Sequence, residues 1–128
     1  MASWTMGKFS FHKDERLKKG KLIKELFNKG SSFNLYPFRV LYLPNPVAAT
    51  AHQVLFTAST RNFKRAVDRN KIKRRSREAY RLQKARLNEA PKLLIGFIYI
   101  ARDILGHAQI SKAMDSALAR ITEACKGQ

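Results

Sequence analysis

The densest cluster of side chains able to do chemistry lies between Arg61 and Arg86. This stretch holds twelve Lys or Arg residues and only two acids, Asp68 and Glu78, so it supplies +10 of the formal net charge of +17. Arg presents a planar fork for paired hydrogen bonds to phosphate oxygens, and Lys presents a flexible point charge. This concentration of cations indicates binding to a polyanion, with nucleic acid as the leading candidate.

Helical periodicity sorts these charges onto one face. At about 100° per residue, a helix here would carry polar and cationic residues on one side and small or apolar residues on the other. Asp68 or Asn70 is expected to cap its start, and the helix ends before Pro91. The cationic face comprises Asn70, Lys73, Arg74, Arg77, Arg81 and Lys84, and the docking face comprises Ile72, Ser76, Ala79, Tyr80 and Leu87.

Residue patterns for catalysis or metal binding are missing from the sequence. His12, His52 and His107 are far apart, and none stands at metal-ligand spacing with Cys or carboxylates. There is no paired-carboxylate motif and no Gly-rich phosphate loop. We therefore expect no catalytic and no metal-binding residue, and we interpret His52 as a strand-edge residue. Cys125, the only cysteine, is interpreted as core filler in a reducing compartment.

The composition is that of one folded domain. With 45% apolar and 10% aromatic residues, the chain can bury a core despite 26 Lys plus Arg against 9 Asp plus Glu. The longest apolar run, residues 93–101, is too short to cross a membrane, and the N-terminus has no signal-like apolar core. We expect a single domain over residues 1–128, flexible at residues 1–10 and located in the cytoplasm.

Further elements must position the basic segment. A first helix is predicted at residues 19–28, where Gly30 is a stop signal and Leu22, Ile23, Leu26 and Phe27 form the apolar face. Strands are predicted at residues 31–34, 38–43 and 52–60. In the third strand, one face carries Val54, Phe56 and Ala58, and the other carries Leu55, Thr57 and Ser59.

The end of the chain supplies a central strand and a final helix. Residues 93–101 are apolar on both faces, as in a strand covered on both sides. A last helix follows from the spacing of Ile110, Met114, Ala117, Leu118, Ile121 and Cys125. The predicted fold is an α/β (α+β) sandwich in the order α-β-β-β-α-β-α, with helices packed on a four-stranded sheet.

Aromatic residues near the basic segment are candidate stacking platforms for single-stranded nucleic acid. A stacked base contributes about 1–3 kcal/mol. Periodicity favours core positions for Phe27 and Phe38 over such a role. The candidates are Phe9, Phe11, Phe27, Phe38 and Tyr42.

The run RAVDRNKIKR at residues 65–74 closely resembles the bacterial ribonuclease P protein component family. Arg69 and Asn70 match the RNR signature of that family, and Lys71 stands for its second arginine. REAYR at residues 77–81 fits the same helix. Further matches bring the resemblance to residues 11–121: Arg16-Leu17, Leu26-Phe27 with Gly30, VLY at residues 40–42 and IYIAR at residues 98–102.

The resemblance implies a fold and a function. The fold would contain a left-handed β-α-β crossover around the RNR segment. The protein would bind the catalytic RNA of ribonuclease P and precursor tRNA, and assist removal of the 5′ leader. The RNA would perform the hydrolysis with magnesium ions bound mainly by the RNA and the substrate. No obligate protein partner and no membrane are expected.

The resemblance also implies two binding surfaces. The catalytic RNA would contact Arg61, Lys64, Arg65, Arg69, Asn70, Lys71, Lys73, Arg74, Arg77 and Arg81. The leader would lie in a cleft between the first helix and the sheet, lined by Phe11, Arg16, Ile23, Phe27, Tyr42, Thr57 and Ser59. The chain departs from the family pattern at Ile23, at residues 57–62 and at Lys64, so cleft polarity and loop geometry can differ.

Two other classes of protein fit the charge. A ribosomal protein, or another structural RNA-binding protein, would share the size and fold, but the RNR-like core argues against it. A basic DNA-packaging protein predicts a preformed dimer, and the sequence has no dimer-forming seam. Sequencing the RNA bound to the protein would distinguish a ribonuclease P subunit from a ribosomal protein. For the former, one enzyme RNA and precursor tRNAs should dominate over ribosomal RNA.

Overall fold

The structure is a computed structural model that describes residues 16–17, 20–44, 52–87 and 92–126. Every predicted helix and strand is present in the predicted order, with ends shifted by a few residues. The elements are α2 (Gly20–Lys29), β1 (Ser31–Leu35), β2 (Phe38–Pro44), β3 (Gln53–Ala58), α3 (Ala66–Gln83), the short 3-10 helix η2 (Lys84–Leu87), β4 (Leu93–Tyr99) and α4 (His107–Lys126). No helix in these ranges is long and apolar enough to span a membrane.

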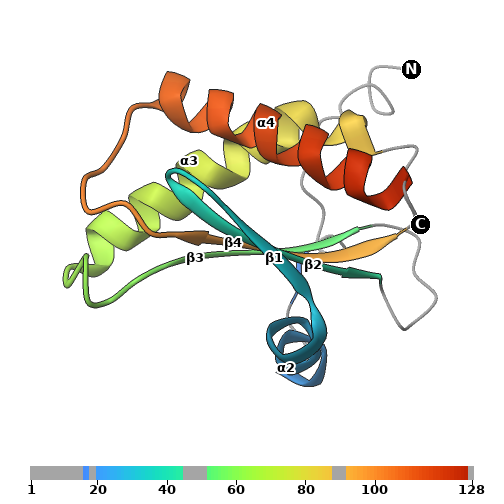
Figure 1. The fold of residues 1–128 in the computed structure, drawn as a ribbon. Coiled ribbons are helices and arrows are strands. Elements are labelled where there is room, and N and C mark those ends of the chain that lie inside the picture. The colour runs from blue at the N-terminus through green and yellow to red at the C-terminus, as the bar shows by residue number, and fades with distance from the viewer. Residues whose placement is uncertain (1–15, 18–19, 45–51, 88–91, 127–128) are drawn as a thin grey trace, which may run out of the picture.

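The four strands form one mixed sheet in the order β1-β2-β4-β3. The β1–β2 and β2–β4 pairs are antiparallel, whereas β3 and β4 are parallel neighbours joined through α3. Helices α3 and α4 cover one face of the sheet, and α2 lies against the other (Figure 1). The basic helix is therefore the crossover of a β-α-β unit.

Strand β4 is the centre of the fold because both of its faces are buried, as its apolar sequence predicts. On one side Leu93, Ile95, Phe97 and Tyr99 pack into the larger core cluster with α3 and α4. On the other side Leu94 joins a smaller cluster with Leu17, Leu22, Leu26 and Leu41. Two separate cores thus hold the helices to opposite faces of one strand.

Close packing of α2 on the sheet depends on two glycines. A Cβ at Gly96 would lie 3.2 Å from Leu26 Cδ2, so the bare backbone of β4 leaves room for the buried leucine. A Cβ at Gly30 would lie 2.4 Å from the Leu26 carbonyl oxygen, to which the Gly30 N–H donates at 2.9 Å. Gly30 follows the helix end as predicted, but it is needed for space, because no described glycine has positive φ.

The start of α3 differs from the prediction. The helix begins at Ala66 with Arg65 as N-cap in an extended conformation (φ −82°, ψ 129°), and no side chain caps it. The Arg65 carbonyl accepts the N–H groups of Asp68 and Arg69, both at 3.2 Å. The prediction that Asp68 or Asn70 caps the helix is wrong, because both lie inside it. Asp68 instead places its charge in the first turn, where the helix dipole favours an anion.

His52 is a buried structural residue that joins two distant segments. The Leu93 N–H donates to His52 Nδ1 at 3.1 Å, so Nε2 carries the proton and donates to the Leu87 carbonyl at 3.1 Å. The side chain is only 8% exposed. The ring connects the start of β3 to the end of η2 and the start of β4, which gives this residue at the start of an edge strand a structural role.

Replacing His52 with Ala should destabilise the protein. The change leaves a buried N–H and a buried carbonyl without these partners, at a cost of about 1–3 kcal/mol each. Thermal unfolding of His52→Ala, with His107→Ala as control, checks this. His107 is exposed at the start of α4, so its loss should leave the melting temperature nearly unchanged. Equal melting temperatures for the two variants would contradict the assignment.

Candidate nucleic-acid interface

The basic helix α3 docks on the sheet by the face that its periodicity predicts. Ile72, Ser76, Ala79 and Tyr80 are all at most 2% exposed, and Leu87 of η2 is fully buried. The Ser76 hydroxyl donates to the Ile72 carbonyl at 2.8 Å, which satisfies this buried polar group. Burying these residues leaves the cationic side of α3 to solvent.

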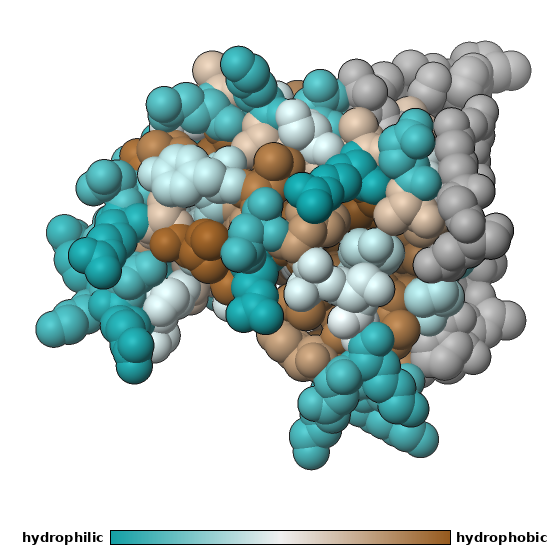
Figure 2. Space-filling view, in the orientation of Figure 1, coloured by the Kyte–Doolittle hydropathy of each residue, from teal (hydrophilic) through white to brown (hydrophobic). Residues whose placement is uncertain are grey.

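All ten residues predicted to bind RNA lie in or just before α3, and none is buried. Figure 2 shows hydrophilic side chains projecting at the left of the molecule, over the β3–α3 turn and the start of α3 in Figure 1. Five of the ten predicted residues are exposed, namely Arg61, Lys64, Arg65, Asn70 and Arg74. The other five are half-buried, namely Arg69, Lys71, Lys73, Arg77 and Arg81.

A hollow runs along the exposed side of α3. Val67, Asn70, Lys71 and Arg74 line it, and its volume is about 470 Å³. Val67 is 65% exposed, which is unusual for a β-branched apolar side chain in a helix surrounded by cations. The spacing i, i+3, i+4, i+7 places these four residues on one stripe of the helix. The stripe combines an exposed apolar side chain with two positive charges.

Arg69 has an internal role that the sequence does not reveal. Its Nη1 donates to the Phe63 carbonyl at 2.8 Å and to the Lys64 carbonyl at 2.9 Å. The guanidinium therefore holds the turn that precedes α3. Arg69, which the resemblance assigns to the RNA interface, therefore also makes contacts within the protein.

The β3–α3 turn is closed by a second small network. Ser59 Oγ accepts the N–H groups of Arg61 at 3.1 Å and Asn62 at 3.4 Å. Asn62 Nδ2 reaches across to the Ile100 carbonyl at 3.4 Å. The Ser59 hydroxyl, predicted to line the leader cleft, is thus used within the turn. The sequence feature that could have predicted this turn is a serine followed by polar residues between a strand and a helix.

Two more arginines of α3 make contacts within the protein. Arg75, which is not among the predicted RNA-binding residues, donates to the Leu105 carbonyl at 2.6 Å and fixes the loop before α4. Arg81 pairs with Glu78, donating from Nε to Oε2 and from Nη2 to Oε1. The hydrogen bond from Arg81 holds the pKa of the Glu78 carboxyl below its usual value. Glu78 thus offsets the charge of Arg81 near the end of α3.

The second predicted surface, on the α2 side of the sheet, is present in part. Phe27 is 47% exposed, so the interpretation of Phe27 as a core residue is wrong, whereas Phe38, at 1% exposed, is in the core. Ile23 packs at the margin of the smaller core cluster. Thr57 lies on this same sheet face, paired in register with Ile98.

Arg16 and Tyr42 complete the description of the predicted cleft. Arg16 is exposed and bridges to Val54 at the β3 edge of the sheet. Tyr42 packs against the larger cluster on the α3/α4 face, with its ring 6.1 Å from that of Phe33. The structure therefore does not bring Tyr42 together with Ile23 and Phe27, and the prediction of one shared cleft is wrong for Tyr42. Phe11 lies outside the described residues, as do residues 1–10.

No metal centre is found in the described ranges, where no three His, Cys, Asp or Glu side chains gather to hold an ion. Cys125 is a half-buried free thiol packed against the larger core cluster. Burial raises the pKa of this thiol, which makes it a weak nucleophile. Fold and site together define an α+β protein with one open cationic helix, the class of a nucleic-acid-binding subunit.

Comparison with known proteins identifies the family. Residues 11–122 match the family model for ribonuclease P. The ribonuclease P protein component of Porphyromonas gingivalis is 34% identical over 119 residues, which is 88% of this chain and 87% of that protein. The one from Chromohalobacter salexigens is 33% identical over 77% of this chain and 75% of its own length. The chain belongs to the ribonuclease P protein component family.

Solved structures of the family share the fold. The ribonuclease P protein of Staphylococcus aureus superposes with a TM-score of 0.70 at 25% identity, over 87% of this chain and 97% of that one. The Thermotoga maritima protein, at 23% identity, has a TM-score of 0.68 over 83% and 96% of the two chains. The predicted fold and its crossover agree with these structures. The protein is thus a subunit of ribonuclease P, a ribonucleoprotein endonuclease that matures tRNA 5′ ends.

Comparing Arg69→Ala with Lys73→Ala should separate an internal role from an RNA contact. Both variants lose one positive charge, but the Arg69 guanidinium also donates two hydrogen bonds to the turn before α3. Arg69→Ala should lower the free energy of unfolding by about 1–2 kcal/mol, because two hydrogen bonds to backbone carbonyls are lost from a half-exposed site.

Lys73→Ala should leave stability unchanged and weaken binding to the catalytic RNA, with the log–log salt slope flatter by about one. Thermal unfolding and filter binding across a salt series measure both effects. An unaltered slope for Lys73→Ala would remove that side chain from the interface. Unchanged stability in Arg69→Ala would show that its hydrogen bonds do not hold the turn.

Proposed function

We propose that the protein binds the catalytic RNA of ribonuclease P through the cationic face of α3. The observation that carries this proposal is the sorting of charge on that helix. Ile72, Ala79 and Tyr80 are buried against the sheet, and cations of the helix, notably Lys73 and Arg74, remain at the surface. Cations repeated every three or four residues can follow a phosphate backbone, and each contact releases counterions.

The same charge gives the subunit a physical means of assisting cleavage. A precursor tRNA and a catalytic RNA are both polyanions, so their association is opposed by repulsion that cations must screen. A protein of net charge +17 supplies such screening locally. We expect the magnesium ions to be held mainly by the RNA and the substrate, with hydrolysis performed by the RNA. The subunit then lowers the magnesium concentration that the reaction requires.

The 5′ leader of the precursor tRNA is proposed to run over the α2 side of the sheet. Phe27 offers an exposed ring there, and Ile23 and Thr57 lie on the same side. Stacking on such a ring tolerates any base sequence, which suits leaders that differ between tRNAs. Hydrogen bonds from β3 would add to this contact. We also propose that the protein is located in the cytoplasm, together with precursor tRNA.

Reconstitution tests the division of labour. Purified protein alone should not cleave precursor tRNA, because no cluster of His, Cys, Asp or Glu among the described residues could hold a catalytic metal ion. Added to the catalytic RNA at low magnesium, it should raise cleavage efficiency, and the gain should shrink as magnesium rises. Product formation is followed on denaturing gels. Multiple-turnover cleavage by protein free of RNA would overturn the assignment of catalysis to the RNA.

Leader length tests the α2 surface. Phe27→Ala should weaken binding of a precursor with a leader of several nucleotides by about 1–3 kcal/mol, the contribution of a stacked base. A substrate with a single-nucleotide leader, which cannot reach Phe27, should bind as before. Since nearly half of the ring is exposed, the fold should tolerate the change.

Tyr42→Ala is the matched control for Phe27→Ala. Tyr42 packs against the core on the other sheet face, so its truncation should lower the melting temperature and affect both substrates equally. Titration of the two substrates into the reconstituted complex measures the difference. Equal weakening of long- and short-leader substrates by Phe27→Ala would argue against leader contact at this surface. A selective long-leader loss in Tyr42→Ala would move that contact to the α4 side.

A further inference from the structure

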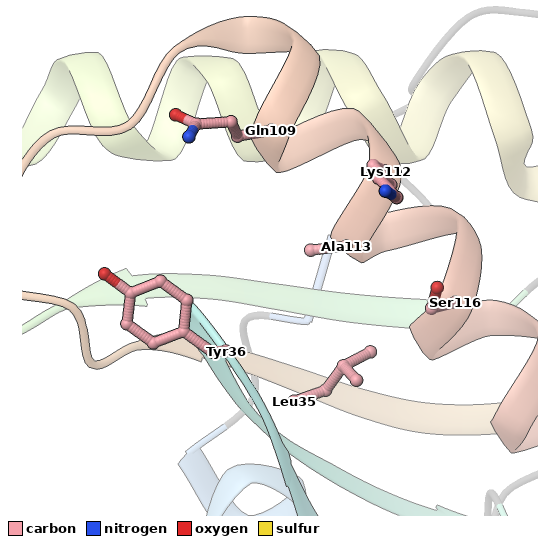
Figure 3. A pocket seen from close by; sticks show the side chains of 6 residues that line it. All are labelled: Leu35, Tyr36, Gln109, Lys112, Ala113 and Ser116. Atoms are coloured by element: carbon pink, nitrogen blue, oxygen red, sulfur yellow. The ribbon is translucent and has the colours of Figure 1, made fainter.

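A second hollow lies away from both surfaces, between the β1–β2 turn and the first half of α4. Its volume is about 240 Å³. Figure 3 shows Tyr36 at the turn and the side chains of α4 reaching toward the same space. The lining residues are Leu35, Tyr36, Gln109, Lys112, Ala113 and Ser116. It opens on the α3/α4 side of the sheet, opposite α2.

Tyr36 is the most exposed large aromatic side chain among the described residues, at 66%. Its ring stands beside an apolar floor made by Leu35 and Ala113, and Ala113 is only 8% exposed. Lys112 projects from the same side of α4 and is exposed. A flat aromatic ring beside a free cation is the arrangement that holds an unpaired nucleotide by its base and its phosphate.

Polar groups on the rim suit the edge of a base. Gln109 Oε1 accepts the Gly106 N–H at 3.2 Å, which orients the carboxamide and leaves its NH₂ group available as a donor. Ser116, two turns further along α4, adds a hydroxyl that can donate or accept. These groups could satisfy a carbonyl or ring nitrogen of a base without specifying one base.

The loop that leads into α4 is held in place by half-buried hydrogen bonds. The Tyr99 hydroxyl donates to the Asp103 carbonyl at 2.5 Å and accepts the Leu105 N–H at 2.9 Å. The Leu105 carbonyl in turn accepts from Arg75. The loop that leads into α4 is therefore fixed from two sides before any ligand arrives. Lys112 is the cationic residue among those that line the hollow, so it is the candidate partner for a phosphate.

We propose that this hollow binds one unpaired nucleotide of RNA, with its base against Tyr36 and its phosphate on Lys112. The volume is below the roughly 300–1,000 Å³ of pockets for drug-sized ligands, and suits a single base. A strongly basic subunit of a ribonucleoprotein favours RNA over an acidic peptide as the occupant. The proposal rests on the RNA-binding function proposed above, and the nucleotide can come from the catalytic RNA or from precursor tRNA.

Two binding measurements on the full-length protein distinguish these sources. The first measures Kd for the catalytic RNA alone, and the second measures Kd of precursor tRNA for the assembled complex. Tyr36→Ala should weaken one of them about five- to tenfold, at the low end for a stacked base because the site is open. Whichever of the two Kd values changes shows whether the nucleotide belongs to the catalytic RNA or to precursor tRNA. Tyr36→Phe, which keeps the ring, should stay within about twofold of wild type.

Lys112→Ala tests the phosphate contact against a charge-matched control. It should weaken the same measurement and flatten its salt slope by about one, whereas Lys92→Ala should not flatten it. Lys92 is exposed just before β4, at the opposite end of the sheet from the β1–β2 turn. Melting temperatures should match wild type, since Tyr36 and Lys112 are both exposed.

Three results would overturn the site. The first is wild-type affinity of Tyr36→Ala in both measurements, and the second is an equal loss in Tyr36→Phe, which would exclude stacking. The third is a salt slope that flattens equally in Lys92→Ala and Lys112→Ala. That result would mean that Lys112 contributes only to the overall charge and makes no specific phosphate contact. Failure of wild-type protein to bind either RNA would instead refute the proposed function, so the two failures are distinguishable.

Discussion

The packing of Tyr80 against the sheet is the contact on which the functional geometry depends. Its ring lies 5.8 Å from Phe56 and 6.3 Å from Phe97, so it joins the basic helix to β3 and β4 at once. Because α3 is fixed by this face, its rotation about its own axis is fixed too. The cationic side chains must then point away from the core. A rotation of α3 would bury charges, which is far more costly than losing an apolar contact.

The two faces of the sheet carry different surfaces because β4 is buried on both. One core joins α3 and α4 to the sheet, and the smaller core joins only α2. Alternation along β2 therefore sends Tyr42 to one side and Leu41 to the other. The aromatic residues divide in the same way. Phe27 stands on the α2 side, and Tyr36 and Tyr42 stand on the α4 side, so aromatic contacts with RNA need not form one continuous track.

The arginines of α3 divide between the protein itself and its surface. Arg69 holds the turn before the helix, Arg75 holds the loop before α4, and Arg81 pairs with Glu78. Arg suits these tasks because its several N–H donors can reach carbonyl oxygens without losing charge. The cations that remain outside are thereby presented on a helix whose preceding turn is fixed and which is tied to the loop before α4. Positioning and binding are shared among residues of the same type, which is why composition alone cannot separate them.

The sequence by itself determined the elements, the docking face of α3 and the family. These follow from local periodicity and from a motif read along one segment, as the burial of Ile72 and Ala79 and the match at residues 65–74 illustrate. Tertiary structure alone decided the internal role of Arg69, the buried bridge made by His52, the exposure of Phe27 and the sheet face of Tyr42. Each of these depends on which backbone group or strand lies opposite a side chain after folding. His52 meets residues 35 and 41 positions away, and no local pattern encodes a contact at that separation.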